Sequence, residues 1–302
     1  MDVRVVGAGV LGLSAAVRLR EAGYDAHVDA RDLPDETTSA VAAALWYPYA
    51  AYPEHLVTRW SARAYAVFAG LASDPDVPVW MRRGRELWRE PAEDPWWRDA
   101  VPGFGRVPPD ALPSGYADGY LFTTPVIDMS GYLAWLVQRL TSLGGTLTRR
   151  AYDSLDDALD GAGVVVDCTG LGARDLVPDP SLVPLRGQVV RVGQVGLTEW
   201  TLDEGHSDGP TYVVPRAHDI VCGGTAGEGD WRLDPDPATA DAILARCRAL
   251  VPALAHAPVL GHRVGLRPAR SQVRLETERR PGGPVVHCYG HGGAGVTLSW
   301  GC

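Results

Sequence analysis

Apolar and polar positions change period twice within the first thirty residues. Residues 3–6 form a short β-branched run, and residues 25–30 form a second strand-like run. Between them, residues 11–22 carry apolar side chains at helical spacing and end at Gly23. A strand, a helix and a strand in this order predict a βαβ unit at the N-terminus.

The middle of the chain has a different pattern. Between about residues 46 and 130, Pro, Trp and Tyr are frequent, and only residues 54–73 keep helical spacing. We therefore expect a second region with loops of its own. Strand and helix alternation resumes with a predicted helix at 129–143, an acidic helix at 154–161 and a strand at 163–170.

Short apolar runs separated by turn residues fill the last third of the chain, with one predicted helix at about 238–250. These runs predict a mixed or antiparallel sheet and comprise residues 186–192, 211–215, 219–225, 262–268 and 273–278. A final strand at 285–289 leads into the glycine-rich segment 290–295, and the apolar residues after it predict the start of a further helix.

Composition narrows the class of protein. With 302 residues, 46% of them hydrophobic, the chain can bury a large core, and it contains no apolar run of membrane-spanning length. The N-terminus lacks the features of a signal peptide, so we expect a cytoplasmic protein. The net charge of -9 is spread without long runs of one sign, which disfavours nucleic acid and membrane as partners.

Two residue types limit the chemistry further. The five cysteines are an odd number and form no C-x-x-C pair, so we expect neither a disulfide framework nor a metal site. Every residue of the Lys+Arg class is Arg, which excludes a lysine base or Schiff base.

The strongest motif is G-x-G-x-x-G at Gly7, Gly9 and Gly12, directly after the first strand and at the start of the helix. Glycines at these positions permit a tight turn, admit a pyrophosphate and let helix and strand pack closely. The motif predicts a dinucleotide on the helix N-terminus. The expected acid for the ribose is less clear, because Arg31 and Asp32 follow Ala30, where the count places it.

Other candidates allow two interpretations each. Residues 37–48 combine hydroxyls with an alanine run, which suits either phosphate and ring contacts or a helix packed on the sheet. Arg267 and Tyr212 lie on strand-like segments; the arginine could hold a carboxylate through two hydrogen bonds or form a structural ion pair. His291 is interpreted as structural or as a cofactor contact, because no spacing around it supports a triad.

Taken together, successive segments resemble the D-amino acid oxidase family of FAD flavoproteins almost from end to end. Three segments are specific: TTSAVAAALW at 37–46, GLRPAR at 265–270 and YGHGGAG at 289–295. The resemblance implies an α/β fold with an α+β insert, in which a Rossmann-like, glutathione-reductase-type FAD-binding domain carries an inserted mixed-sheet substrate-binding domain. Its implied limits are 1–50, 135–185 and 262–302 for the FAD-binding domain, and 51–134 and 186–261 for the substrate-binding domain.

The resemblance also assigns residues to non-covalently bound FAD. Those near the pyrophosphate, ribose and phosphates would be Gly7, Ala8, Gly9, Val10, Leu11, Gly12, Arg31, Asp32, Thr37, Thr38 and Ser39. Those near the flavin or elsewhere along FAD would be Ala43, Ala44, Leu45, Thr169, Gly170, Arg267, Gly292, Gly293, Ala294, Gly295, Val296 and Thr297.

For the substrate, the resemblance implies that Arg267 and Tyr212 hold the α-carboxylate and that the Gly293 carbonyl receives the α-amino group. The implied reaction is hydride transfer from Cα to flavin N5, with reoxidation by O2, which converts a D-amino acid to a 2-oxo acid, ammonia and hydrogen peroxide. No acid or base on the protein is needed.

The chain departs from the family in three places. A second active-site tyrosine has no evident counterpart, since Ser207 and Asp208 stand before Tyr212, so the pocket should be open. Ala226 replaces a larger residue or an arginine, which favours neutral, apolar D-amino acids. The helix that usually follows the closing W-G segment is absent, by a naturally short tail or by trimming.

Alternatives within the fold are a D-aspartate oxidase, a glycine or sarcosine oxidase, and a flavin dehydrogenase that uses another acceptor. A flavoprotein that only binds nucleotide as a sensor is an alternative of another class. The oligomeric state is left open, with a homodimer as one option.

Overall fold

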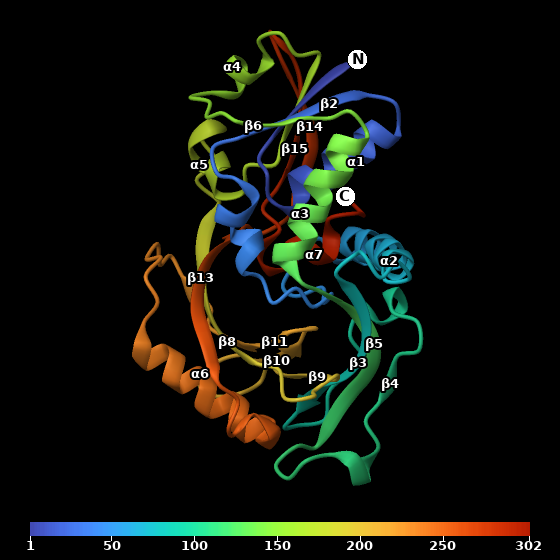
Figure 1. Ribbon diagram of the computed structural model, residues 1–302, viewed down its shortest axis with the longest axis vertical. Coiled ribbons are helices and arrows are strands. Elements are labelled where there is room, and N and C mark those ends of the chain that lie inside the picture. Colours follow the sequence, from blue (N-terminus) through green and yellow to red (C-terminus); the bar gives the residue numbers. More distant parts are fainter.

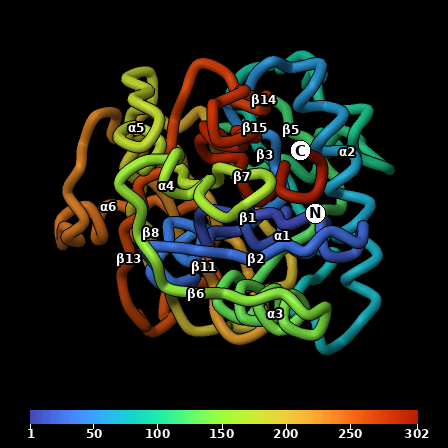
Figure 2. Tube along the Cα trace, turned by 90° about the horizontal axis from the view of Figure 1, so that it is seen from above, coloured from blue at the N-terminus to red at the C-terminus, as the bar shows by residue number.

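The computed structural model describes all residues from 1 to 302 and contains two mixed sheets with helices around them (Figure 1). The smaller sheet has the order β14-β15-β7-β1-β2-β6, and it is followed from one edge to the other in Figure 2. Its strands are β1 (Asp2–Val6), β2 (Asp25–Ala30), β6 (Leu147–Arg149), β7 (Val164–Asp167), β14 (Arg274–Arg280) and β15 (Gly283–Tyr289).

Five strands of the smaller sheet run parallel, and only the edge strand β14 is antiparallel to its neighbour. Helices flank both faces, with α1 and α3 on one side and α4 on the other (Figures 1 and 2). The helices of this half are α1 (Val10–Glu21), α3 (Met129–Ser142), α4 (Leu155–Leu159), α5 (Ala173–Leu176) and α7 (Gly295–Leu298). The predicted N-terminal βαβ unit is confirmed.

The larger sheet follows the order β12-β8-β11-β10-β9-β3-β5-β4, and β13 pairs with the far side of β8. Its strands are β3 (Val79–Trp88), β4 (Gly105–Arg106), β5 (Asp118–Ile127), β8 (Val183–Gly193), β9 (Trp200–Asp203), β10 (Thr211–Pro215), β11 (Asp219–Gly223), β12 (Gly227–Glu228) and β13 (Val259–Ala269). Two helices accompany the larger sheet, α2 (Glu54–Leu71) and α6 (Pro237–Leu250). The predicted mixed or antiparallel sheet is confirmed for the runs up to residue 268, whereas the run at 273–278 forms β14 of the smaller sheet.

Two long strands of this sheet, β3 and β5, were not predicted from the sequence. They pair over ten residues from Val79↔Ile127 to Trp88↔Asp118. Three arginines interrupt the apolar alternation of β3, and Pro125 lies within β5, where it cannot donate a ladder hydrogen bond. The hydrophobic pattern of each strand alone is therefore too weak to identify it.

The sheets also bear on the expected domain limits. Residues 262–269 were grouped with the FAD-binding pieces, but they lie in β13 and pair with β8 in the larger sheet. The chain passes to the smaller sheet only with β14. The limits of the two domains otherwise stay a prediction.

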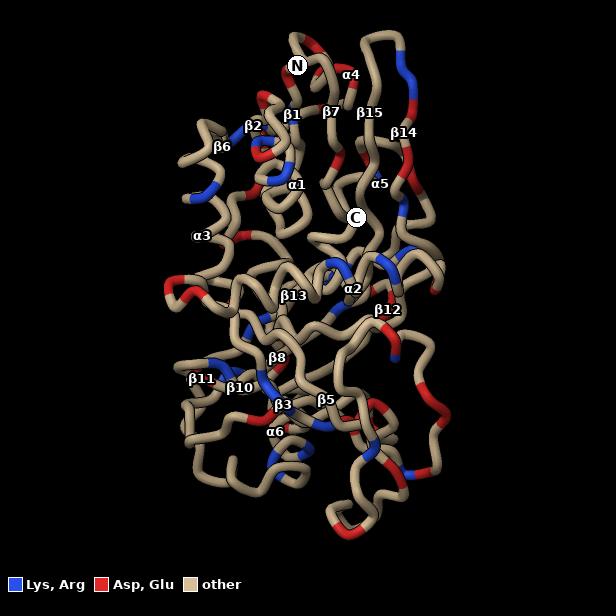
Figure 3. Tube along the Cα trace, turned by 90° about the vertical axis from the view of Figure 1, so that its right-hand side faces the viewer, with Lys and Arg blue, Asp and Glu red and all other residues tan.

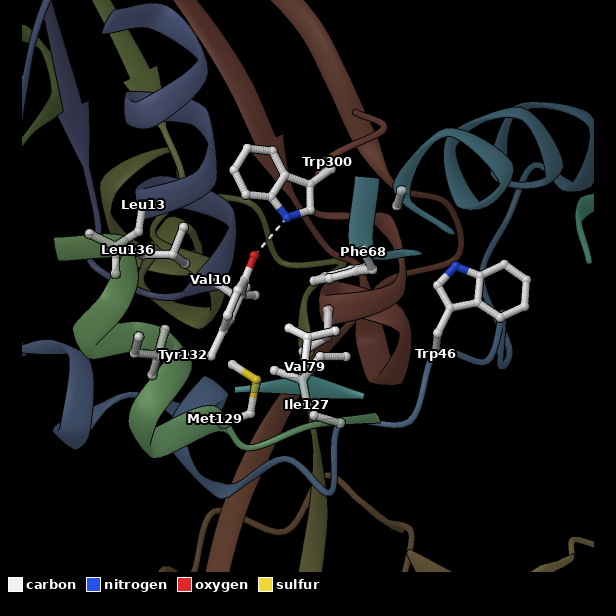
Figure 4. Packing of buried hydrophobic residues seen from close by; sticks show 14 of the residues in the cluster. Val10, Leu13, Trp46, Phe68, Val79, Ile127, Met129, Tyr132, Leu136 and Trp300 are labelled. Carbon is white, nitrogen blue, oxygen red and sulfur yellow. Dashed lines mark hydrogen bonds between the residues drawn. The ribbon is translucent and has the colours of Figure 1, made fainter. Parts of the chain in front are cut away.

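The segment after the last glycines is packed into the main core (Figure 4). Trp300 is buried beside α1 and α3, and its indole Nε1 donates a hydrogen bond of 2.7 Å to the hydroxyl of Tyr132. Val296 and Leu298 are buried as well. This packing holds the glycine-rich segment 290–295 in a fixed place between the two sheets.

Charged positions of both signs are interspersed along the chain trace (Figure 3). None of the helices combines the length and apolar composition that crossing a bilayer requires. Four cysteines are buried and Cys302 is exposed, and all five are free thiols.

Candidate cofactor and substrate site

A cavity of about 820 Å³ lies between the carboxyl ends of the smaller sheet and one face of the larger sheet. Nearly all the residues expected at a cofactor or substrate line it: Gly7, Ala8, Gly9, Val10, Leu11, Arg31, Asp32, Thr37, Thr38, Ser39, Ala43, Ala44, Leu45, Thr169, Gly170, Tyr212, Arg267, Gly292, Gly293, Gly295 and Val296. The exceptions are Gly12, Ala294 and Thr297, which lie just behind the wall.

The first glycines form the turn between β1 and α1. Gly7 has a φ of +113°, and a Cβ there would lie 2.5 Å from the carbonyl oxygen of Cys168 at the end of β7. A Cβ on Gly12 would lie 1.9 Å from the carbonyl oxygen of Gly7, so this glycine lets α1 pack directly on the turn. Glycine is therefore required at both positions by contacts within the protein.

The hydroxyl segment that follows β2 is held against the start of α1 and against β13. Ser39 Oγ accepts a hydrogen bond of 3.0 Å from the Val10 amide, and Thr38 Oγ1 donates to the Leu266 carbonyl at 3.0 Å. Thr37 Oγ1 donates to the Pro34 carbonyl at 2.7 Å. Of these three hydroxyl groups, only that of Ser39 keeps its proton free to donate to a phosphate in the cavity.

At the end of β2, Arg31 and Asp32 pair with each other. The guanidinium donates to the carboxylate at distances of 2.6 and 3.1 Å, and both residues line the cavity. Asp29, by contrast, is buried behind them and accepts a hydrogen bond from Tyr152. Asp32 is thus a carboxylate that lines the cavity and can meet ribose hydroxyls there.

The alanine run and the glycine-rich segment both line the cavity, and the residues that follow each of them are joined by hydrogen bonds. Thr297 Oγ1 accepts a hydrogen bond from the Tyr47 amide and donates one to the Tyr47 carbonyl, both at 3.0 Å. This side chain therefore joins the two segments and does not enter the cavity. Ala294, fully buried, packs in the adjoining core.

The substrate end is formed by side chains that rest on glycines of neighbouring strands. A Cβ on Gly187 of β8 would lie 2.5–2.7 Å from three guanidinium atoms of Arg267, so the guanidinium lies flat across that strand. Arg267 Nη1 donates to the Thr225 carbonyl at 2.9 Å, and Arg267 forms no ion pair with an acid. The alternative interpretation as a structural ion pair is therefore wrong.

Tyr212 is placed in the same way. A Cβ on Gly223 would lie 2.0 Å from its ring, and one on Gly224 would lie 2.6 Å from it. Burial raises the pKa of the Tyr212 hydroxyl, and the nearby positive charge of Arg267 opposes that rise. The phenol thus stays a neutral donor beside a free guanidinium, which is a suitable pair of groups for a carboxylate.

Gly293 lies beside both the arginine and a second phenol. A Cβ at Gly293 would be 3.0 Å from Cδ1 of Tyr49 and 3.7 Å from Cδ of Arg267. Tyr49 was not identified from the sequence, although it stands only three residues after the specific TTSAVAAALW segment. Tyr49 thus supplies a second tyrosine to the substrate end of the cavity. It comes from the segment after the alanine run, whereas the stretch before Tyr212 has none.

Glu204 is another cavity residue that was not identified from the sequence. It follows β9 directly and lines the cavity, and its carboxylate forms no hydrogen bond or ion pair with the chain. Burial raises its pKa to about 7, while the charge of Arg267 acts in the opposite direction. No sequence signal distinguishes it from the neighbouring acids.

His291, near the glycines, is buried and lines the cavity, with its Nε2 3.4 Å from the Cys302 sulfur. No carboxylate orients its ring, as a triad would require.

Thr169 donates from Oγ1 to Asp167 at 2.7 Å, and Asp167 is also 3.0 Å from His287 Nδ1. These contacts fix the end of β7 beside the first glycine turn.

Known proteins share this architecture. The chain is 57% identical to the D-amino-acid oxidase of Rubrobacter xylanophilus over 99% of this chain and 92% of that protein. It is 45% identical to the D-amino-acid oxidase of Streptomyces coelicolor, over 100% of this chain and 94% of that one. The solved structure of glycine oxidase from Geobacillus kaustophilus has a TM-score of 0.81 at 19% identity, covers 99% of this chain and 91% of that one, and confirms the fold class. Residues 2–302 match the DAO family, described as FAD dependent oxidoreductase, and the chain belongs to that family.

Proposed function

We propose that the cavity binds FAD at its α1 end and a D-amino acid at its Arg267 end, and that the protein is a D-amino acid oxidase. The overall reaction converts a D-amino acid, O2 and water to a 2-oxo acid, ammonia and hydrogen peroxide. The observation that carries the substrate assignment is the guanidinium of Arg267, which faces the cavity without an acid partner.

The residues present suit FAD. The cavity extends from the Gly7 turn and the start of α1 to the glycine-rich segment, and backbone N-H groups and small side chains line that length. The Ser39 hydroxyl and Asp32 are available for phosphate and ribose groups, respectively. FAD, when bound, supplies the two-electron acceptor that the protein's own side chains lack.

The protein's contribution to the reaction is to bind and orient the substrate. Arg267 and Tyr212 hold the α-carboxylate, and the Gly293 carbonyl accepts an N-H of the α-amino group. When two of the four substituents on Cα are held, the chirality of Cα decides whether the hydrogen or the side chain points toward the flavin. Only the enantiomer whose hydrogen points toward the flavin reacts. No side chain in this arrangement is required to remove the Cα proton.

The walls favour neutral, apolar side chains. Ala226 and Leu202 line the cavity, and Trp231 and Leu233 line it while remaining 51% and 63% exposed. Ala226 cannot pair with a second carboxylate, so we expect D-aspartate to be a poor substrate. A cytoplasmic location and a homodimer remain predictions.

A peroxide assay over a panel of D- and L-amino acids tests the proposal. We expect hydrogen peroxide from neutral D-amino acids and none from their L-enantiomers, with flavin released from the denatured protein. D-aspartate as the best substrate would identify a D-aspartate oxidase instead, and glycine or sarcosine would identify an oxidase of that type. Reduction of a dye by D-amino acids without peroxide in air would identify a dehydrogenase.

A further inference from the structure

We infer that Glu204 gives the site a subsite for a positively charged side chain, so that it accepts D-amino acids such as D-lysine and D-arginine besides apolar ones, and rejects a second carboxylate. The inference rests on the proposed function, because it takes the substrate to be held at Arg267. It assigns to Glu204 a role in specificity and none in the oxidation itself.

The pairing of the strands directs Glu204 toward the substrate. In the β9-β10 ladder, Leu202 lies directly opposite Tyr212, and both side chains line the cavity. Glu204 comes directly after the strand, at the first residue of a turn, and lines the same cavity as Leu202 and Tyr212. Diagonal neighbours across two strands have Cα atoms about 7–8 Å apart, a distance on the scale that the three- or four-carbon stem of a basic side chain spans.

The adjacent acid, Asp203, is a carboxylate that pairs within the protein through one of its two oxygens, Oδ2. Asp203 points to the opposite face, is 1% exposed, and accepts hydrogen bonds from Arg89 at 2.8 Å and from Tyr116 at 2.6 Å. Glu204 has no such partner although it is half-buried. An ionised carboxylate in that setting is stabilised by any cation that enters the cavity.

The only cation near Glu204 is Arg267, which binds the α-carboxylate at the other end of the substrate. The charged and titratable groups that act on Glu204 are Arg267, Tyr212, Tyr47, Tyr49, Glu86 and Asp203. Once an α-carboxylate occupies Arg267, its charge offsets that of the guanidinium. Glu204 then has no uncompensated cation beside it, which favours a substrate with a second positive charge at its far end.

Apolar surface lies between the two charged ends. Leu202 and the rings of Tyr47 and Tyr49 line the cavity with Glu204, so methylene groups of a basic side chain would be covered while its terminal charge meets the carboxylate. D-norleucine presents the same stem as D-lysine without the ammonium group. The two substrates therefore isolate the contribution of the charge.

The test compares kcat/KM for D-lysine and D-norleucine in the wild-type holoenzyme and in Glu204→Gln. We expect Glu204→Gln to lower the D-lysine to D-norleucine ratio by about tenfold or more, the usual scale for a charge-assisted hydrogen bond, with D-norleucine nearly unchanged. Glu204→Lys should reverse the preference and raise activity on D-glutamate. The matched control is Glu199→Gln, which removes an exposed carboxylate just before β9, outside the cavity.

An unchanged ratio in Glu204→Gln would overturn the inference. So would an equal loss on both substrates, since that result would mean Glu204 serves the α-amino group common to them. If the variants do not fold, the wild-type ratio settles the question, because it should rise between pH 6 and 8 as Glu204, whose pKa is about 7, ionises. Absence of peroxide from D-norleucine would instead refute the proposed function.

Discussion

At its α1 end the cavity presents backbone groups and small side chains, whereas at the larger sheet it presents long polar side chains from separate strands. Gly7, Gly9 and Ser39 lie within two short segments, and contacts inside the protein fix them. Arg267 and Tyr212 come from β13 and β10, and each rests on a glycine of a neighbouring strand.

The difference follows from what each end must bind. A pyrophosphate is recognised by N-H groups and a helix N-terminus, which any sequence supplies once side chains are out of the way. A small zwitterion needs charges at defined distances, and the protein must leave those charges without internal partners. Arg267 and Glu204 both meet this condition, since neither side chain forms an ion pair within the protein.

Removing the charge at the substrate end should have the largest effect on activity. We expect Arg267→Met to lower kcat/KM about a thousandfold, mainly through KM, because the α-carboxylate loses a charge-assisted contact in a partly buried site. Flavin absorbance and melting temperature should stay close to wild type, since Arg267 makes only one hydrogen bond in the chain. Arg267→Lys should recover only part of the loss, because an ammonium cannot bind a carboxylate through two parallel hydrogen bonds. Kinetics unchanged in Arg267→Met would remove the substrate-site assignment.

The α1 end was predictable from the sequence because its structure depends on residues that are close together in the chain. Gly7, Gly9 and Gly12 stand at fixed spacing after a strand and before a helix, and this spacing alone specifies the turn. The hydroxyl and alanine segment and the glycine-rich segment were also identified. What the sequence could not provide was the role of Thr297, which binds the Tyr47 backbone behind the wall.

The larger sheet could be predicted only in part. Its strands after residue 180 were recognised from their apolar runs, but the side chains that face the cavity depend on pairing register, and register is a property of two strands together. Leu202 faces the cavity opposite Tyr212, and Asp203 faces the other way, while Glu204 reaches the cavity from the turn that follows the strand. Tyr49 lies there because its segment meets Gly293, which is more than two hundred residues away in the sequence.

Crowding the α1 end should weaken cofactor binding rather than change substrate choice. The Cβ of Gly12→Ala would lie 1.9 Å from the carbonyl oxygen of Gly7, and both groups are backbone, so α1 must move away from the turn. Overpacking of this size costs about 1–3 kcal/mol, and we expect the dissociation constant for FAD to rise by up to a hundredfold. Flavin fluorescence titration of the apoprotein measures it.

The matched control for this change is Gly70→Ala in α2, where an added Cβ meets nothing within 4 Å. It should bind FAD as wild type does. Equal affinity of Gly12→Ala and Gly70→Ala would show that the close contact between α1 and the turn does not determine cofactor binding.

Crowding the substrate end should weaken substrate binding and leave cofactor binding unchanged. In Gly187→Ala the three atoms nearest the new Cβ would all belong to the guanidinium of Arg267, which is the far end of a flexible side chain and can shift. The fold and FAD affinity should therefore be preserved, while the displaced arginine raises KM for neutral D-amino acids about tenfold. Steady-state peroxide kinetics beside flavin content measure both. Loss of FAD with an unchanged KM would mean that the two ends are not separable in this way.

The smallest expected effect concerns Glu86, a carboxylate buried in β3 behind the substrate end. It accepts a hydrogen bond of 2.8 Å from the Tyr47 hydroxyl, its other oxygen has no partner, and burial raises its pKa from 4.5 to about 8. The folded protein thus keeps Glu86 protonated at pH values where the unfolded chain ionises it, so its contribution to stability is present below about pH 4.5 and is lost as pH rises toward 8. Glu86→Gln removes this titration and keeps the shape. We expect it to raise the melting temperature by a few degrees at pH 8 and by much less at pH 5, with Glu199→Gln showing no such difference. An equal shift at both pH values would show that Glu86 is already ionised in the folded protein. The larger sheet would then tolerate a buried charge at Glu86 as well as the unpaired charges of Arg267 and Glu204 that face the cavity.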